Sequence, residues 1–209
     1  MPESYPLDLP SVSGIASVRL VARNVIGVSQ SPFTFSQQVF RHQGQRWEAD
    51  ISLPPMTRDN AEEWASFLLR LRGQFGTFLL GDPANATPRG SAAITPGTPV
   101  VNGANQKGDF LNISGLPASV TGYLRSGDYI QLGAASTARL HKVLEAVNTN
   151  ASGEATLNLW PQVREAFPNQ SPVVVTNAKG VFRLATSDTG WDIETNRIYG
   201  ITFGAIEAI

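Results

Sequence analysis

The sequence contains no cysteine, and this absence removes several classes of function at once. Disulfide frameworks, thiolate zinc sites and cysteine nucleophiles are all excluded. Long apolar runs are also missing, since no stretch approaches the roughly 18 residues of a membrane-spanning helix. The N-terminus lacks the basic segment and apolar run of a secretory signal. We therefore expect a chain that is synthesised and folded in the cytoplasm, without a membrane anchor.

Charge is scarce and balanced. Charged residues make up 16% of the 209 residues, and the net charge is −1, whereas an average soluble protein has about 25% charged residues. There is no basic excess to bind a phosphate backbone, so we expect no sequence-specific binding of nucleic acid. Hydrophobic residues reach 42%, which indicates a globular chain with a sizeable core. With so few charges, either partners cover much of the surface, as in a component of an assembly, or the surface is neutral and polar.

Groups suited to catalysis or metal binding are few and scattered. His42 and His141, the two histidines, fall beside a predicted turn and inside a predicted strand, without the spacing of a metal motif. Glu62 and Glu63 are adjacent at a predicted helix start, where the helix dipole accounts for negative charge. Turn chemistry accounts for three aspartates: Asp82, Asp109 and Asp128. We predict no catalytic, cofactor-binding or metal-binding residue, and therefore no enzyme.

Two segments admit a ligand-binding interpretation beside a structural one. Residues 103–108 (Gly-Ala-Asn-Gln-Lys-Gly) are glycine-rich, but they lack the spacing of a P-loop and no predicted helix follows them. A β-turn is therefore favoured over a phosphate site. Trp160 could stack on a sugar in a barrel of the OB type, a fold that binds oligosaccharides. Its position at the end of an apolar strand, before a proline, favours packing instead.

The first 83 residues predict a β-rich unit with one helix. Residues 1–10 contain three prolines and are expected to form an extended arm. The helix should begin at Thr57 and end at Gly73, because apolar residues recur at helical spacing between them. That stripe consists of Ala61, Trp64, Ala65, Leu68 and Leu71. Alternating polarity and turn signals predict strands at 17–28, 34–41, 45–53 and 77–80, the second and third joined by a turn at Gln43-Gly44.

Composition changes after Pro83, where Ala, Pro, Thr, Asn and Gly become frequent. Short strands separated by turn signals follow, which is typical of a small β-barrel. They are predicted at 99–101, 110–113, 129–132, 139–147, 155–159 and 173–175. Longer strands return at 181–185 and 199–203, and the last should rejoin the first sheet. The fold class is thus mainly β: a β-sandwich-like domain with one α-helix (residues 1–83 and 180–209) and an inserted OB-like β-barrel (residues 84–179).

Several segments together resemble the distal tail proteins of long-tailed bacteriophages. The order of parts carries the resemblance. Residues 47–56 and 76–83 flank the helix with Trp64, Phe67 and Leu68, as in the N-terminal domain of that family. Residues 103–108, 124–132 and 141–143 are similar to an OB-fold domain that is inserted in some members. The ending also fits, with residues 182–184, 200–203 and Glu207-Ala208.

The resemblance implies a structural protein of the virion, located at the tail tip or baseplate. Such proteins form a hexameric ring coaxial with the tail tube, with the β-domains forming the ring and the OB-like domains projecting outward. The ring joins the tail tube protein to the baseplate hub and receptor-binding proteins, and DNA passes through its lumen. The family has no catalytic residues or cofactor to carry over. Two alternatives stay open: a soluble β-rich binding module, and a virion module that binds or cleaves carbohydrate.

Overall fold

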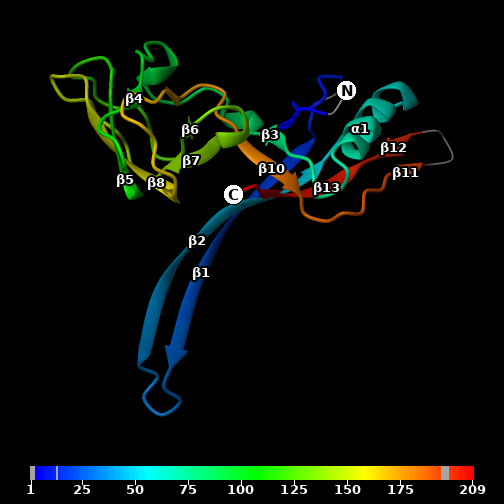
Figure 1. Cartoon of the computed structure of the whole chain (residues 1–209), viewed down its shortest axis with the longest axis horizontal. Coiled ribbons are helices and arrows are strands. Elements are labelled where there is room, and N and C mark those ends of the chain that lie inside the picture. The colour runs from blue at the N-terminus through cyan, green and yellow to red at the C-terminus, as the bar shows by residue number, and fades with distance from the viewer. Residues whose placement is uncertain (1–2, 13, 194–197) are drawn as a thin grey trace.

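The computed structural model describes residues 3–12, 14–193 and 198–209, and it is built mainly from strands. A five-stranded sheet with one α-helix, a barrel-like six-stranded sheet and a projecting hairpin make up the molecule (Figure 1). The prediction of a mainly β fold with a single helix is confirmed. Among the described residues, no helix is long and apolar enough to cross a membrane.

The five-stranded sheet combines strands from both ends of the chain. Its order is β1-β2-β13-β10-β3, and every neighbouring pair is antiparallel. The strands are β1 (Ser17–Gln30), β2 (Gln37–Ser52), β3 (Phe78–Leu80), β10 (Gly180–Leu184) and β13 (Thr202–Glu207). The last strand therefore pairs with an N-terminal one, β2, as the sequence pattern indicates. A two-stranded ribbon, β11 (Asp192–Ile193) with β12 (Tyr199–Gly200), adjoins it.

Helix α1 (Arg58–Arg70) packs on one face of this sheet and closes the first core. Thr57 is the N-cap residue, as expected, although its side chain makes no capping hydrogen bond. The apolar stripe is buried: Trp64 and Leu68 are each 1% exposed. Aromatic contacts join the helix to the sheet, with ring centroids 6.2 Å apart for Trp64 and Phe203 and 5.7 Å for Phe67 and Phe78. The helical periodicity thus identified the face that meets the sheet.

The predicted turn at Gln43-Gly44 is wrong. Strand β2 runs unbroken through both residues, and the turn between β1 and β2 lies at residues 31–36. Asn24 pairs with Gln45 but Ile26 pairs with Arg41, so the extra residues of a β-bulge, Gly44 among them, lie on β2. A Cβ atom on Gly44 would come within 2.7 Å of a Val25 methyl group. The glycine therefore permits close approach of two strands and does not reverse the chain.

Residues 3–10 lie against their own chain and do not project from it. Leu7 is 8% exposed, and its backbone forms a bridge to Phe78 at the edge of β3. The Tyr5 hydroxyl donates to the carbonyl oxygen of Arg70 at 2.7 Å, and Glu3 pairs with the same arginine at 2.8 Å. The N-terminal segment therefore covers an edge of its own sheet, which leaves it unsuited to reach a neighbour.

The six-stranded sheet (the barrel, residues 100–174) has the order β4-β5-β8-β7-β6-β9. A further bridge between Val100 and Pro172 links its first and last strands, so the sheet is nearly closed. Its strands are β4 (Val100–Val101), β5 (Gly108–Ser114), β6 (Tyr129–Leu132), β7 (Arg139–Val143), β8 (Ala155–Val163) and β9 (Val173–Val174). Three short 3-10 helices lie at its borders: η1 (Pro83–Asn85), η2 (Ser91–Ala93) and η3 (Ala135–Thr137). The interior is filled by its own apolar cluster, including Leu111, Ile113 and Leu157.

Candidate assembly interface

The most exposed part of the molecule is the outer section of the β1–β2 hairpin, here called the hairpin arm (residues 24–45). It extends well beyond the rest of the molecule (Figure 1). Strand β13 pairs with β2 only from Glu48 to Ser52, so nothing in the described chain pairs with the outer edge of the arm's strands. Large apolar side chains of the arm lie in solvent: Val28 (59% exposed), Phe33 (91%), Phe35 (72%), Val39 (61%) and Phe40 (63%).

The arm is also free of charge over most of its length. No charged residue occurs between Arg23 and Arg41, a segment that includes both flanks of the turn. Exposed aromatic residues without charges are the composition of a protein–protein interface core, where charged residues are depleted. Contiguous exposed apolar surface of this kind is typical of a contact region. The composition of the arm therefore indicates a surface that another protein covers.

The backbone of the arm leads to the same conclusion. A two-stranded ribbon alone is marginally stable in water, because neither face is buried. The free edge of β1 also presents unpaired N–H and C=O groups that can pair with a strand of another chain. At the arm's tip, Ser31 and Thr34 hydrogen-bond only to residues of the turn itself. The arm thus offers both apolar side chains and open backbone for a partner.

Charged residues gather on the outer face of the sheet at the root of the arm. Glu48 accepts hydrogen bonds from Arg23 and Arg46, with closest distances of 3.1 Å and 2.7 Å. These two guanidinium groups, Arg23 first, hold the pKa of Glu48 below its usual range. Arg19 and Asp50 form a further pair at 3.4 Å, with both side chains largely exposed. This face is a solvated, self-neutralised surface, in contrast to the uncharged arm.

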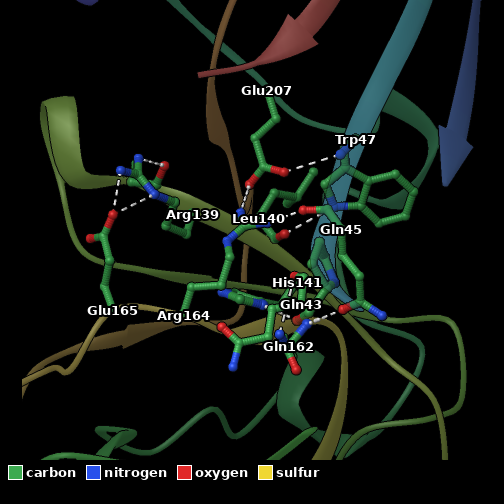
Figure 2. Close-up of polar contacts among 12 residues, drawn as sticks. Gln43, Gln45, Trp47, Arg139, Leu140, His141, Gln162, Arg164, Glu165 and Glu207 are labelled. Carbon is green, nitrogen blue, oxygen red and sulfur yellow. Dashed lines mark hydrogen bonds and ion pairs between the residues drawn. The ribbon is translucent and has the colours of Figure 1, made fainter. Parts of the chain in front are cut away.

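A buried polar network joins the five-stranded sheet to the barrel (Figure 2). The indole N–H of Trp47 donates to the carbonyl oxygen of Leu140 at 2.9 Å. The carboxylate of Glu207 accepts from the backbone N–H of Trp47 at 3.0 Å and from Arg164 at 2.9 Å. Burial raises the pKa of Glu207, against the opposing attraction of Arg164. These contacts tie β2, β13, β7 and the segment that follows β8 together at one point.

His141 lies beside this network, inside β7, and it is fully buried. Its Nδ1 atom is 2.7 Å from the carbonyl oxygen of Pro161, which can only accept, so Nδ1 carries the proton. Its Nε2 atom has no hydrogen-bond partner among the described residues. Desolvation lowers the pKa of His141 to about 4. The imidazole is therefore neutral near pH 7 and packs as a core side chain.

The other candidate residues of the sequence do not come together in one site. His42 is exposed on the arm, and Glu62 and Glu63 lie on the outer side of α1. Asp128 is 1% exposed and accepts from the backbone N–H groups of Arg89 at 3.0 Å and Arg125 at 2.8 Å, so it anchors two loops. Within the described ranges, no group of three or more metal-ligating side chains is present.

Trp160 and residues 103–108 also have structural roles. The Trp160 ring packs edge-on against Trp47, with centroids 4.4 Å apart, and its indole N–H donates to Asn24 at 2.9 Å. Gln106 holds the 103–108 turn together: its amide nitrogen donates to the carbonyl oxygens of Asn102 and Gly103, and its amide oxygen accepts from the N–H of Asn112. Packing and turn formation account for both segments.

Sequence reasoning missed the hairpin arm, although a signal for it was present. The absence of charge between Arg23 and Arg41 is visible in the sequence, and it is unusual for a hairpin whose side chains face water. No family model matches this chain, and no curated protein matches it either.

Proposed function

We propose that this protein is a structural component of the tail tip of a long-tailed bacteriophage, and that it assembles into a six-membered ring. The observation that carries the proposal is the hairpin arm, which is long, uncharged and apolar, and has open strand edges. The absence of charge suits permanent burial against another subunit. An assembly component needs such a surface, whereas a monomeric binding module does not.

The arm of one subunit contacts the β-sheet region of the next subunit in this proposal. The contact is head-to-tail, because the arm and the surface that receives it are different parts of the chain. Contacts of this type generate rings when the rotation closes. The free edge of β1 supplies backbone pairing, and the side chains of Phe33, Phe35 and Phe40 supply apolar area. Ring closure therefore protects edges that would otherwise promote aggregation.

In the virion, the ring joins the tail tube protein on one side to the baseplate hub and receptor-binding proteins on the other. Its role is mechanical, and the protein catalyses no reaction. The net charge of −1 suits a lumen through which DNA passes without being held. The barrel lies on the outer side of the ring.

A reconstruction of the tail tip tests this proposal directly. Six copies should surround the tube axis, with the hairpin arms in contact between neighbours and the barrels outside. In the matched genetic test, Phe33→Ser with Phe35→Ser should abolish ring closure and leave the melting temperature unchanged, because both side chains lie in solvent. Ile94→Ser is the control, since Ile94 is 87% exposed but lies away from the arm. Absence of the chain from the particle, or normal assembly of the double variant, would refute the proposal.

A carbohydrate-binding role for the barrel is the second candidate, and one observation favours it. Phe110 on β5 is 60% exposed, and its cross-strand partner is Asn158. Asn112 and Thr156 form the next pair on the same face and are joined by a hydrogen bond of 2.7 Å. A bare ring beside amides is a surface on which a sugar can stack. Glycan binding that Phe110→Ala removes would support this role, and hydrolysis of the glycan would overturn the non-enzymatic assignment.

A further inference from the structure

The hairpin arm is not held by its own strands alone, because the barrel contacts it on both sides of the bulge. Figure 2 shows Gln43 and Gln45 of β2 beside Gln162 of β8 and Arg164, which directly follows β8. The bulge between Asn24 and Ile26 interrupts the regular pairing of β1 with β2. A bulge is the place where a ribbon bends. The residues that pack against the bulge can therefore set the direction of the arm.

At the bulge itself, the barrel supplies three hydrogen bonds. The indole N–H of Trp160 donates to the side-chain oxygen of Asn24 at 2.9 Å, and Gln45 donates to the same oxygen at 3.0 Å. The backbone N–H of Gln162 donates to the side-chain oxygen of Gln45 at 2.8 Å. The guanidinium of Arg164 donates to the carbonyl oxygen of Gln45. Gln45 is 6% exposed, so both ends of its amide are committed to fixed partners.

Two more contacts hold the arm further out, one within the bulge and one beyond it. The side-chain amide of Gln162 donates to the carbonyl oxygen of Gln43 at 3.2 Å. Arg41 then binds Asp109 of β5 through two parallel hydrogen bonds, of 2.7 Å and 2.5 Å. The hydrogen bond from Arg41 lowers the pKa of Asp109. A two-pronged contact of this kind fixes direction as well as distance.

We infer that the barrel is a brace that sets the angle of the hairpin arm. All of these contacts reach the arm through β2 and Asn24, on the side that faces the barrel. Among the described residues, the other side-chain hydrogen bonds of the arm join only its own residues. A marginal ribbon with a bulge at its base would otherwise sample a range of directions. The brace restricts it to one direction before any partner arrives, and this lowers the entropy lost on binding. The inference concerns one chain and does not depend on the proposed ring.

Distances between two spin labels measure the angle of the arm directly. Because the chain has no cysteine, cysteines at Thr34 in the turn and at Glu63 on α1 give a unique labelled pair. Labelled protein is diluted into an excess of unlabelled protein, so that only distances within one chain contribute. The labelled protein with all of the barrel contacts intact, which is the reference, should give one narrow distance peak. A broad distribution in this reference protein would overturn the inference, whether or not the chain forms rings.

The test variants remove the brace in steps. Asp109→Asn, alone and together with Gln162→Ala and Trp160→Phe, should progressively broaden the peak and move its mean. Phenylalanine keeps an aromatic ring against Trp47 but lacks the indole donor. The reciprocal exchange, Arg41→Asp with Asp109→Arg, should restore a narrow peak. Melting temperatures identify variants that fail to fold. Asp109→Asn changes only a partly exposed ion pair, so this variant should fold and still test the inference if the combined variants do not.

The matched control is Arg23→Gln, which removes an ion pair with Glu48 on the opposite side of the arm's root. It should leave the peak unchanged. If the stepwise variants give the same narrow peak as the reference, the strands alone set the angle and the inference fails. If Arg23→Gln broadens the peak as much as Asp109→Asn does, the effect is not specific to the barrel and the inference fails as well.

Discussion

His141 should make the protein lose stability in mild acid. The imidazole has an ordinary pKa of 6.5, and burial lowers the pKa in the folded chain to about 4. As pH falls through this window, the imidazole of His141 becomes protonated in the unfolded chain but stays neutral in the folded chain. Stability therefore falls between pH 6.5 and about 4, and the full penalty is present below that range. One pKa unit corresponds to about 1.4 kcal/mol, so the loss is about 3 kcal/mol.

Urea unfolding followed by tryptophan fluorescence measures this loss, since Trp47 and Trp64 lie in the core. The unfolding free energy should be determined at several pH values from about 7 down to about 4.5. In His141→Gln, the amide can still donate to the carbonyl oxygen of Pro161 but does not titrate. The unfolding free energy of wild type minus that of this variant should therefore decrease, by up to about 3 kcal/mol, as pH falls.

The comparison also separates His141 from the buried carboxyl group near it. The pKa of Glu207 is raised by burial, so the contribution of Glu207 becomes more favourable as pH falls, opposite in sign to that of His141. Both proteins contain Glu207, and subtraction removes its effect. His42→Gln is the control, because the His42 side chain is exposed on the arm. Equal pH slopes for wild type and His141→Gln in this window would refute the reasoning.

Three further substitutions test the packing of the two sheets. Leu68→Ala should lower the unfolding free energy by about 2–5 kcal/mol, because this side chain is 1% exposed in the core under α1. A loss below about 1 kcal/mol in urea melts would contradict that placement. Glu207→Ala should cost about 3–5 kcal/mol, because it leaves the mostly buried guanidinium of Arg164 without its carboxylate partner, and combining Glu207→Leu with Arg164→Met should recover most of this loss. Asp128→Asn should cost about 1–3 kcal/mol in calorimetry, because the carboxylate anchors two backbone N–H groups.

Periodicity in the sequence predicted those elements that have one buried face. The stripe from Ala61 to Leu71 marks the buried side of α1, and alternation from Trp47 to Leu53 marks the buried side of β2. The same reasoning fails in the hairpin arm, where neither face is buried and polar and apolar residues have no reason to alternate. Ser29, Ser31 and the glutamines near the turn therefore look like loop residues, although most lie in strands.

Polar residues were harder to interpret than apolar ones. The turn containing Asp128 was predictable from Ser126-Gly127-Asp128, but its burial depends on the loop at Arg89, which is distant in sequence. The N-terminal segment shows the same limit. Its prolines predict extended backbone, whereas its docking depends on the single apolar side chain of Leu7 and the hydroxyl of Tyr5. Isolated anchors of this kind produce no periodic signal.

The place where the chain enters and leaves the barrel has a consequence for evolution. Leu80 and Gly180 are direct cross-strand partners, so the points where the chain enters and leaves the barrel lie side by side at the end of the antiparallel pair of β3 and β10. Beyond them, the N–H of Asn177 donates to the carbonyl oxygen of Ala86, which extends this two-stranded stem towards the barrel. Genetic recombination at the stem can exchange one insert for another without changing the strand pairing of the five-stranded sheet. Because Arg41 and Gln45 bind the barrel, however, a foreign insert must also fit the arm, and this requirement limits which grafts succeed.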